Sequence, residues 1–127
     1  MAKKSPMALT LAILKERDLV YEKTEHWNAF AKCRNDFLGF IDIVVLMGKY
    51  HVGIQVTTQA NRSARIKKIT TDKKIRPKVT KWLERGDRIE VWGWHKIMRR
   101  RTDGKRGKVG VWQANIAMIT LADMMHE

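Results

Sequence analysis

The sequence predicts an α/β fold, with a mixed central β-sheet flanked by helices. Two observations favour this class. Signals for a helix, three strands, helices and two further strands follow one another along the chain. Two of those strand signals are strongly apolar, yet each holds one polar residue, Asp42 or Gln55. With 127 residues and 44% hydrophobic residues, we expect residues 1–127 to form one domain around a single core.

The first elements are a helix and a weak strand. Ser5 is a suitable N-cap and Pro6 suits a first turn, so residues 6–18 predict an amphipathic helix. Residues 20–27 alternate weakly and indicate a partly exposed strand, and residues 28–36 read as a polar loop.

The central hairpin is the clearest signal. Residues 37–47 and 50–58 are rich in β-branched and aromatic side chains, and Gly48-Lys49 between them indicates a turn. We therefore expect two antiparallel neighbouring strands.

The second half continues with helices and another hairpin. Residues 59–71 and 77–85 predict helices, and Gly86 is a C-cap for the second one. Residues 88–96 and 109–121 predict strands. The basic segment 99–108 between them contains Asp103-Gly104, a typical hairpin turn.

Asp42 and Gln55 are the main candidates for chemistry. A carboxylate buried without a partner costs several kcal/mol, so Asp42 needs a metal ion, a cationic side chain or access to solvent. Because the two residues lie in neighbouring strands, we expect them to meet at one edge of the sheet. This arrangement is typical of a magnesium-dependent nuclease. The alternative for Asp42 is a structural ion pair with a lysine or arginine.

The positive charge indicates a nucleic-acid partner. The formal net charge is +13, and residues 61–108 carry 18 basic and 5 acidic residues, which is the whole excess. Such a block attracts polyanions by phosphate neutralisation, so a nucleic acid is the expected partner, and a basic face alone does not distinguish DNA from RNA. The alternative is a solvated basic face. No basic helix has the apolar opposite face that a membrane surface requires.

The sequence disfavours disulfide-bonded, cysteine-zinc, membrane-spanning and secreted proteins. Cys33 is the only cysteine, which excludes an intrachain disulfide and a cysteine-based zinc site. No apolar run approaches the roughly 20 residues of a spanning helix, and no signal peptide is recognised. We therefore expect a cytoplasmic location, in a bacterial or phage-infected host cell.

Five segments, taken in order, carry a resemblance to a known family. They are residues 36–42, 53–58, 61–68, 82–86 and 89–94. Together they resemble the small phage and bacterial members of the PD-(D/E)XK nuclease superfamily. The resemblance implies a restriction-endonuclease-like fold with an αβββαβ core, and metal-dependent hydrolysis of DNA phosphodiester bonds.

The resemblance also implies roles for residues. Asp42 matches the family aspartate on the second strand, and Gln55 matches the glutamate or glutamine on the third. Thr57 stands where the family usually has a catalytic lysine. Lys68 on the following helix could replace that lysine, with Lys67 and Arg65 as alternatives. The acid of the first helix is best matched by Glu16, although Glu22 or Glu25 could fill that position.

The implied cofactor is Mg²⁺, or Mn²⁺, held by oxygens of Asp42, Gln55 and the Val56 backbone carbonyl. Each residue also has a structural reading. Gln55 could be a hydrogen-bonded strand residue, Thr57 a β-former and Glu16 a solvated helix residue. Asp36 is favoured as a cap of the turn before the strand, with a place near the metal as the alternative.

The basic residues predict contacts with the nucleic-acid backbone. The expected set is Arg62, Arg65, Lys67, Arg99, Arg100, Arg101, Lys105, Arg106 and Lys108. No recognition helix is evident, so we expect recognition of structure rather than of base sequence. Cutting both strands symmetrically would call for a homodimer. The alternatives are a catalytically inactive nucleic-acid-binding protein of the same fold, and an RNA-binding or RNA-processing factor.

Overall fold

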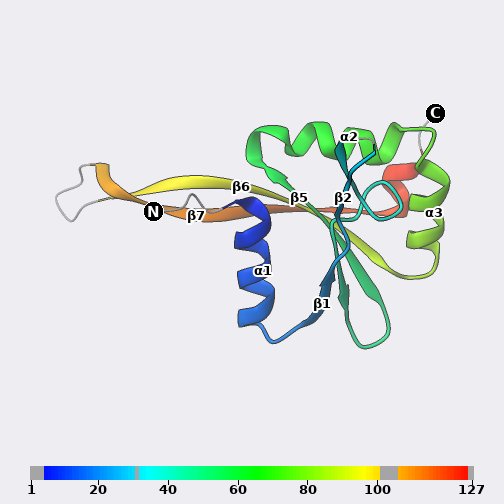
Figure 1. The fold of residues 1–127 in the computed structure, drawn as a ribbon, viewed down its shortest axis with the longest axis horizontal. Helices are drawn as coiled ribbons and strands as arrows, with labels where there is room; N and C mark the ends of the chain where they lie inside the picture. The colour runs from blue at the N-terminus through cyan, green and yellow to red at the C-terminus, as the bar shows by residue number, and fades with distance from the viewer. Residues whose placement is uncertain (1–4, 31, 101–105, 126–127) are drawn as a thin grey trace.

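The computed structural model describes residues 5–30, 32–100 and 106–125, and confirms the α/β class: a mixed five-stranded sheet with helices packed on it (Figure 1). The helices are α1 (Pro6–Glu16), α2 (Arg62–Thr71) and α3 (Arg76–Glu84), with 3-10 turns η1 (Gln59–Asn61) and η2 (Leu121–Met124). The strands are β1 (Val20–Lys23), β2 (His26–Asn28), β3 (Cys33–Asn35), β4 (Ile43–Leu46), β5 (His51–Thr58), β6 (Arg88–Arg100) and β7 (Arg106–Ile119).

The main sheet has the strand order β1-β4-β5-β6-β7. Strands β5 and β6 are parallel, and the other neighbouring pairs are antiparallel. A parallel pair needs a crossover connection, which η1, α2 and α3 supply between β5 and β6. The predicted order of helix, three strands, helices and two strands is thus present in the main sheet.

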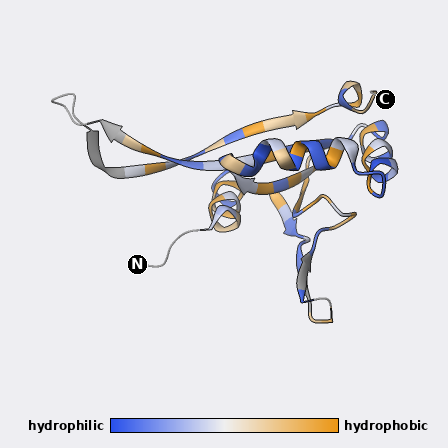
Figure 2. Cartoon of the chain, turned by 90° about the horizontal axis from the view of Figure 1, so that it is seen from above, coloured by the Kyte–Doolittle hydropathy of each residue, from blue (hydrophilic) through white to orange (hydrophobic). Residues whose placement is uncertain are grey.

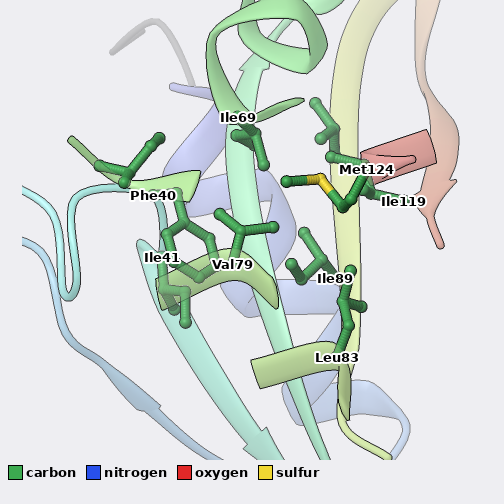
Figure 3. Close-up of a cluster of buried hydrophobic side chains, with 10 residues drawn as sticks. Phe40, Ile41, Ile69, Val79, Leu83, Ile89, Ile119 and Met124 are labelled. Carbon is green, nitrogen blue, oxygen red and sulfur yellow. The ribbon is translucent and has the colours of Figure 1, made fainter. Parts of the chain in front are cut away.

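Hydrophobic side chains pack on both faces of the sheet. On one face, Leu14 of α1 lies in a cluster with Trp92 and Trp94 of β6. On the other face, α2 and α3 close a second cluster, shown in Figure 3. Its labelled members are Phe40, Ile41, Ile69, Val79, Leu83, Ile89, Ile119 and Met124. The sheet is therefore the middle layer between helices.

The prediction of one strand over residues 37–47 was wrong in its first half. Leu38 and Gly39 have φ angles of +58° and +88°, and the chain turns back so that Phe37 and Ile41 exchange two backbone hydrogen bonds of 2.8 and 3.0 Å. A Cβ on Gly39 would lie 2.6 Å from Ile75 Cγ2, so glycine also permits close packing there. The strand β4 begins only at Ile43.

The predictions for residues 20–27 and 28–36 were also partly wrong. The strand stops at Lys23, because the backbone N–H groups of Thr24 and Glu25 donate to the Asp42 carbonyl at 2.8 and 3.1 Å. The following residues form β2, which pairs with β3 in a second, two-stranded sheet. The segment expected to be a loop therefore contributes a strand.

The last hairpin is longer than predicted. Strand β6 continues to Arg100 and β7 already begins at Arg106, whereas the predicted turn at Asp103-Gly104 lies outside the described residues. Figure 1 shows the two strands extending together beyond the rest of the fold. Within the described ranges, no helix has the length and apolar character needed to cross a membrane.

Candidate metal centre

Asp42 lies immediately before β4 and is only 3% exposed. Its Oδ2 accepts two hydrogen bonds from β5, one from Gln55 Nε2 at 2.7 Å and one from the Val56 N–H at 2.8 Å. The predicted meeting of Asp42 and Gln55 at neighbouring strands is confirmed. The two donors fix the position of the carboxylate, and both of these hydrogen bonds go to the same oxygen, Oδ2.

Two further acids approach Asp42. Carboxylate oxygens of Glu25, Asp36 and Asp42 all lie within 4.8 Å of one another, so the three residues form a candidate metal-binding triad. The backbone contacts of Thr24 and Glu25 with Asp42 bring in Glu25, and the turn at Leu38-Gly39 brings Asp36 back to the start of β4. Two separate local features of the backbone therefore bring the other two acids to Asp42.

The pKa of Asp42 is raised from 3.8 to about 8, and burial is the largest cause. A hydrogen bond with Asp36 and the negative charges of Asp36 and Glu25 also act to raise this pKa, and the hydrogen bond from the Val56 N–H opposes the rise. The cluster therefore favours a bound proton when no cation is present. A divalent cation would neutralise the same charge, and carboxylate oxygens are the ligands that Mg²⁺ and Mn²⁺ prefer.

The triad opens into a pocket of about 460 Å³. Its lining consists of Ser5, Pro6, Met7, Glu25, Asp36, Asp42, Gln55, Val56, Thr57, Thr58, Arg65 and Lys68. Ser5 caps α1, since its Oγ accepts from the Ala8 N–H at 3.1 Å, so the positive end of that helix dipole faces the pocket. With Arg65 and Lys68 of α2, the pocket combines an acidic cluster with positive charge suited to a phosphate.

Most of the predicted site residues are brought together. Asp42, Gln55, Val56 and Thr57 line one pocket with Lys68, so residues of β5 and α2 meet there. Thr57 itself is buried. The role of the Gln55 and Val56 oxygens as metal ligands stays a prediction, because the contacts seen are the hydrogen bonds that both residues donate to Asp42.

Glu16 is not at this site. It is the exposed last residue of α1, whereas the opposite end of that helix lines the pocket. An 11-residue helix separates its ends by about 15 Å, too far for a shared ion. Glu25, predicted from the sequence as an alternative to Glu16, is the acid that lies close to Asp42.

Asp36 is the site residue that sequence reasoning undervalued. It was favoured as a turn cap, but it hydrogen-bonds to Asp42 and belongs to the triad. The signal that could have shown this is Gly39 between the two aspartates, since a glycine can reverse the chain within the apolar run.

The predicted nucleic-acid-binding residues that the structure describes lie on α2 and on the two strands of the β6–β7 hairpin. Arg62, Arg65 and Lys67 are on α2, and Arg62 packs against Gly93 of β6. Arg99 and Arg100 lie in β6, and Arg106 and Lys108 lie in β7. Arg101 and Lys105 fall outside the described residues.

The chain matches no known protein-family model, no curated protein and no solved structure in comparisons with each. The arguments for its function therefore rest on its own fold and on the geometry of the triad.

Proposed function

We propose that this protein is a metal-dependent nuclease that hydrolyses DNA phosphodiester bonds and is organised like the PD-(D/E)XK nucleases. One observation carries the proposal: the triad of Glu25, Asp36 and the buried Asp42 shares a pocket with Arg65 and Lys68. Carboxylates this close to one another repel when they are ionised, and a divalent cation held between them removes the repulsion. A phosphodiester group would be attracted both to a cation held by the acids and to the positive charges of Arg65 and Lys68.

The triad supplies enough oxygen ligands for Mg²⁺, which keeps several waters in its shell and needs few protein groups. When bound, the ion would polarise the phosphate and lower the pKa of an attacking water. Gln55 and the Val56 N–H hold Asp42 in place through its Oδ2. Arg65 and Lys68 would offset the negative charge that develops on the phosphate in the transition state.

The location of Lys68 supports a displaced catalytic lysine. Thr57 occupies the strand position where the family pattern has lysine, and both Thr57 and Lys68 line the same pocket. The side chain of Lys68 on α2 can therefore act in the same pocket as a lysine at the Thr57 position of β5 would. Its ammonium group would carry the positive charge that threonine lacks.

A cleavage assay tests the proposal. Supercoiled plasmid, branched DNA and structured RNA would be incubated with the protein in Mg²⁺, in Mn²⁺ and in EDTA. We expect DNA cleavage that EDTA abolishes, and at least a 100-fold lower rate for Asp42→Asn. Glu84→Gln, an exposed acid on α3, serves as the matched control and should cleave at the wild-type rate. Cleavage in EDTA, or full activity of Asp42→Asn, would contradict the proposal.

A second pair of variants tests the cation. Lys68→Met should lower the turnover number by 10-fold to 1,000-fold, since charge stabilisation in the transition state is typically worth several kcal/mol. Lys73→Met removes an exposed lysine just beyond α2 and should have little effect. Equal activities of the two variants would assign no catalytic role to Lys68.

A nucleic-acid-binding protein without hydrolytic activity is the second candidate. The observation that favours it is the neutral pair Gln55 and Thr57, in place of a second carboxylate and a lysine on β5. Binding of DNA without cleavage of any substrate would support this candidate. Cleavage confined to RNA would instead indicate an RNA-processing enzyme.

A further inference from the structure

The β6–β7 hairpin leaves the sheet as a two-stranded ribbon. Strand β6 pairs with β5 only over residues 88–94, while its pairing with β7 continues through Met98↔Gly110 and Arg100↔Arg106. Residues 95–100 of β6 and residues 106–113 of β7 thus lie beyond β5, and the β6 part alone corresponds to a reach of about 20 Å. Figures 1 and 2 show this extension from two directions.

The ribbon starts at the edge of the acidic pocket. Thr58, the last residue of β5, lines the pocket and pairs with Trp94 of β6. Trp94 is held in place, since its Nε1 donates to Thr10 Oγ1 of α1 at 2.8 Å. A nucleic-acid strand lying in the pocket would therefore pass the base of the ribbon.

The described part of the ribbon has two different faces. On one face, Lys96 lies across Gly110, where a Cβ would come within 2.3 Å of Lys96 Cε, and its Nζ lies 5.9 Å from the centre of the Trp112 ring. On the other face, the cross-strand pair Ile97 and Val111 is 44% and 43% exposed. An isolated ribbon is marginally stable in water, so such an exposed apolar pair on it favours a partner.

The charge of the ribbon indicates what that partner is. Residues 96–108 include seven lysines and arginines and one aspartate. Arg100 and Arg106 occupy directly opposed positions in the ladder. A bound phosphate chain would neutralise this concentration of positive charge.

We propose that this hairpin is an arm that enters the major groove of double-stranded DNA. The major groove is about 12 Å wide and admits a two-stranded ribbon, while an A-form RNA duplex has a deep, narrow one. Arg100 and Arg106 would contact phosphates, and Ile97 with Val111 would contact apolar base edges such as thymine methyls. The inference rests on the proposed function for its DNA partner, and it defines the substrate class as duplex.

Binding without metal tests the arm separately from catalysis. Fluorescence anisotropy in EDTA would measure the affinity for a labelled 20-base-pair DNA duplex and for one of its strands alone. We expect Arg100→Gln/Arg106→Gln to lose at least 10-fold in affinity for the duplex and less than 3-fold for the single strand. The slope of log K against log salt on the duplex should fall by about 1.8 in magnitude, as expected for two lost phosphate contacts.

The control removes the same charge elsewhere. Lys73→Gln/Lys78→Gln changes exposed lysines around the start of α3, at the end of the fold opposite the hairpin in Figure 1, and should lose less than 3-fold on either ligand. Ile97→Thr/Val111→Thr keeps β-forming side chains and the ribbon charge, and should weaken duplex binding alone. Circular dichroism and thermal unfolding would verify that each variant is folded.

A modified duplex tests the groove. Bulky substituents on the C5 atom of thymines project into the major groove, and should weaken wild-type binding at least 10-fold. Unchanged affinity for that duplex, or equal losses on duplex and single strand in the arginine variant, would overturn the inference. Absence of cleavage would refute the nuclease proposal while leaving this binding result intact, so the two failures are distinguishable.

Discussion

Replacing Asp42 by asparagine should stabilise the metal-free protein at alkaline pH while abolishing its response to Mg²⁺. Asparagine has nearly the same shape, and its side-chain oxygen can still accept the hydrogen bonds from Gln55 Nε2 and the Val56 N–H. Its amide group can donate to Asp36, whose carboxylate hydrogen-bonds to Asp42 in the native protein. The substitution therefore removes the titratable carboxyl group and changes little else.

The magnitude follows from the raised pKa of Asp42. The pKa is about 8 in the folded protein and 3.8 when unperturbed, so the unfolded chain releases this proton first as the pH rises. The contribution of Asp42 to the free energy of unfolding is thus highest below pH 4, and it falls by about 1.4 kcal/mol per pH unit until the pH passes the folded pKa. Between pH 5 and pH 8, the native protein should therefore lose at most about 4 kcal/mol of stability through this group, and Asp42→Asn should not show this loss.

Urea unfolding followed by circular dichroism, at pH 5 and pH 8, measures this difference. In EDTA, the advantage of Asp42→Asn over the native protein should grow by about 2–4 kcal/mol from pH 5 to pH 8. Added Mg²⁺ at ten times its dissociation constant should raise native stability by about 1.4 kcal/mol and leave the variant unchanged. A variant that is less stable at pH 8 in EDTA, or that responds to Mg²⁺ like the native protein, would refute the reasoning.

Three other substitutions test the supports of the site. Gln55→Glu should tighten Mg²⁺ binding about tenfold, or about 1.4 kcal/mol by calorimetry, and lower stability in EDTA at pH 8, because it places another carboxylate beside Asp42; weaker Mg²⁺ binding would count against a metal at the triad. Gly39→Ala should cost about 1–3 kcal/mol in urea unfolding, since alanine is strained at a φ of +88° and meets Ile75. Gly48→Ala, with no atom within 4 Å of the added Cβ, is its control, and equal losses would contradict the role of the turn. Thr10→Val should cost about 1–3 kcal/mol because it leaves the buried Trp94 Nε1 without an acceptor, and an unchanged unfolding midpoint would argue against that bond.

Much of the fold was predictable because its signals are local. The helix α1 follows from Ser5 and Pro6, and the β4–β5 hairpin follows from two apolar strands around Gly48. The pairing of Asp42 with Gln55 was also predictable, since neighbouring strands in register bring their ends together. These features depend on residues close in sequence or on one simple hairpin.

The candidate site was predictable only in part. Residues 37–41 have the composition of a strand, and propensity alone cannot show that the left-handed conformations of Leu38 and Gly39 reverse the chain. Ile75, from the segment before α3, packs against that turn, and this long-range contact has no local signal. Glu16 appeared the better acid because the family pattern places one on the first helix, but that helix presents its other end to the pocket.

The amino-acid order alone established a basic α/β chain with a carboxylate and an amide buried at adjoining strands, since composition and alternation are properties of the linear polymer. Which acids accompany Asp42 was decided only on folding. Asp36 and Glu25 reach it through a reversed turn and through backbone N–H groups that bond to the Asp42 carbonyl. Such convergence depends on packing between distant segments, and no periodicity along the chain encodes it.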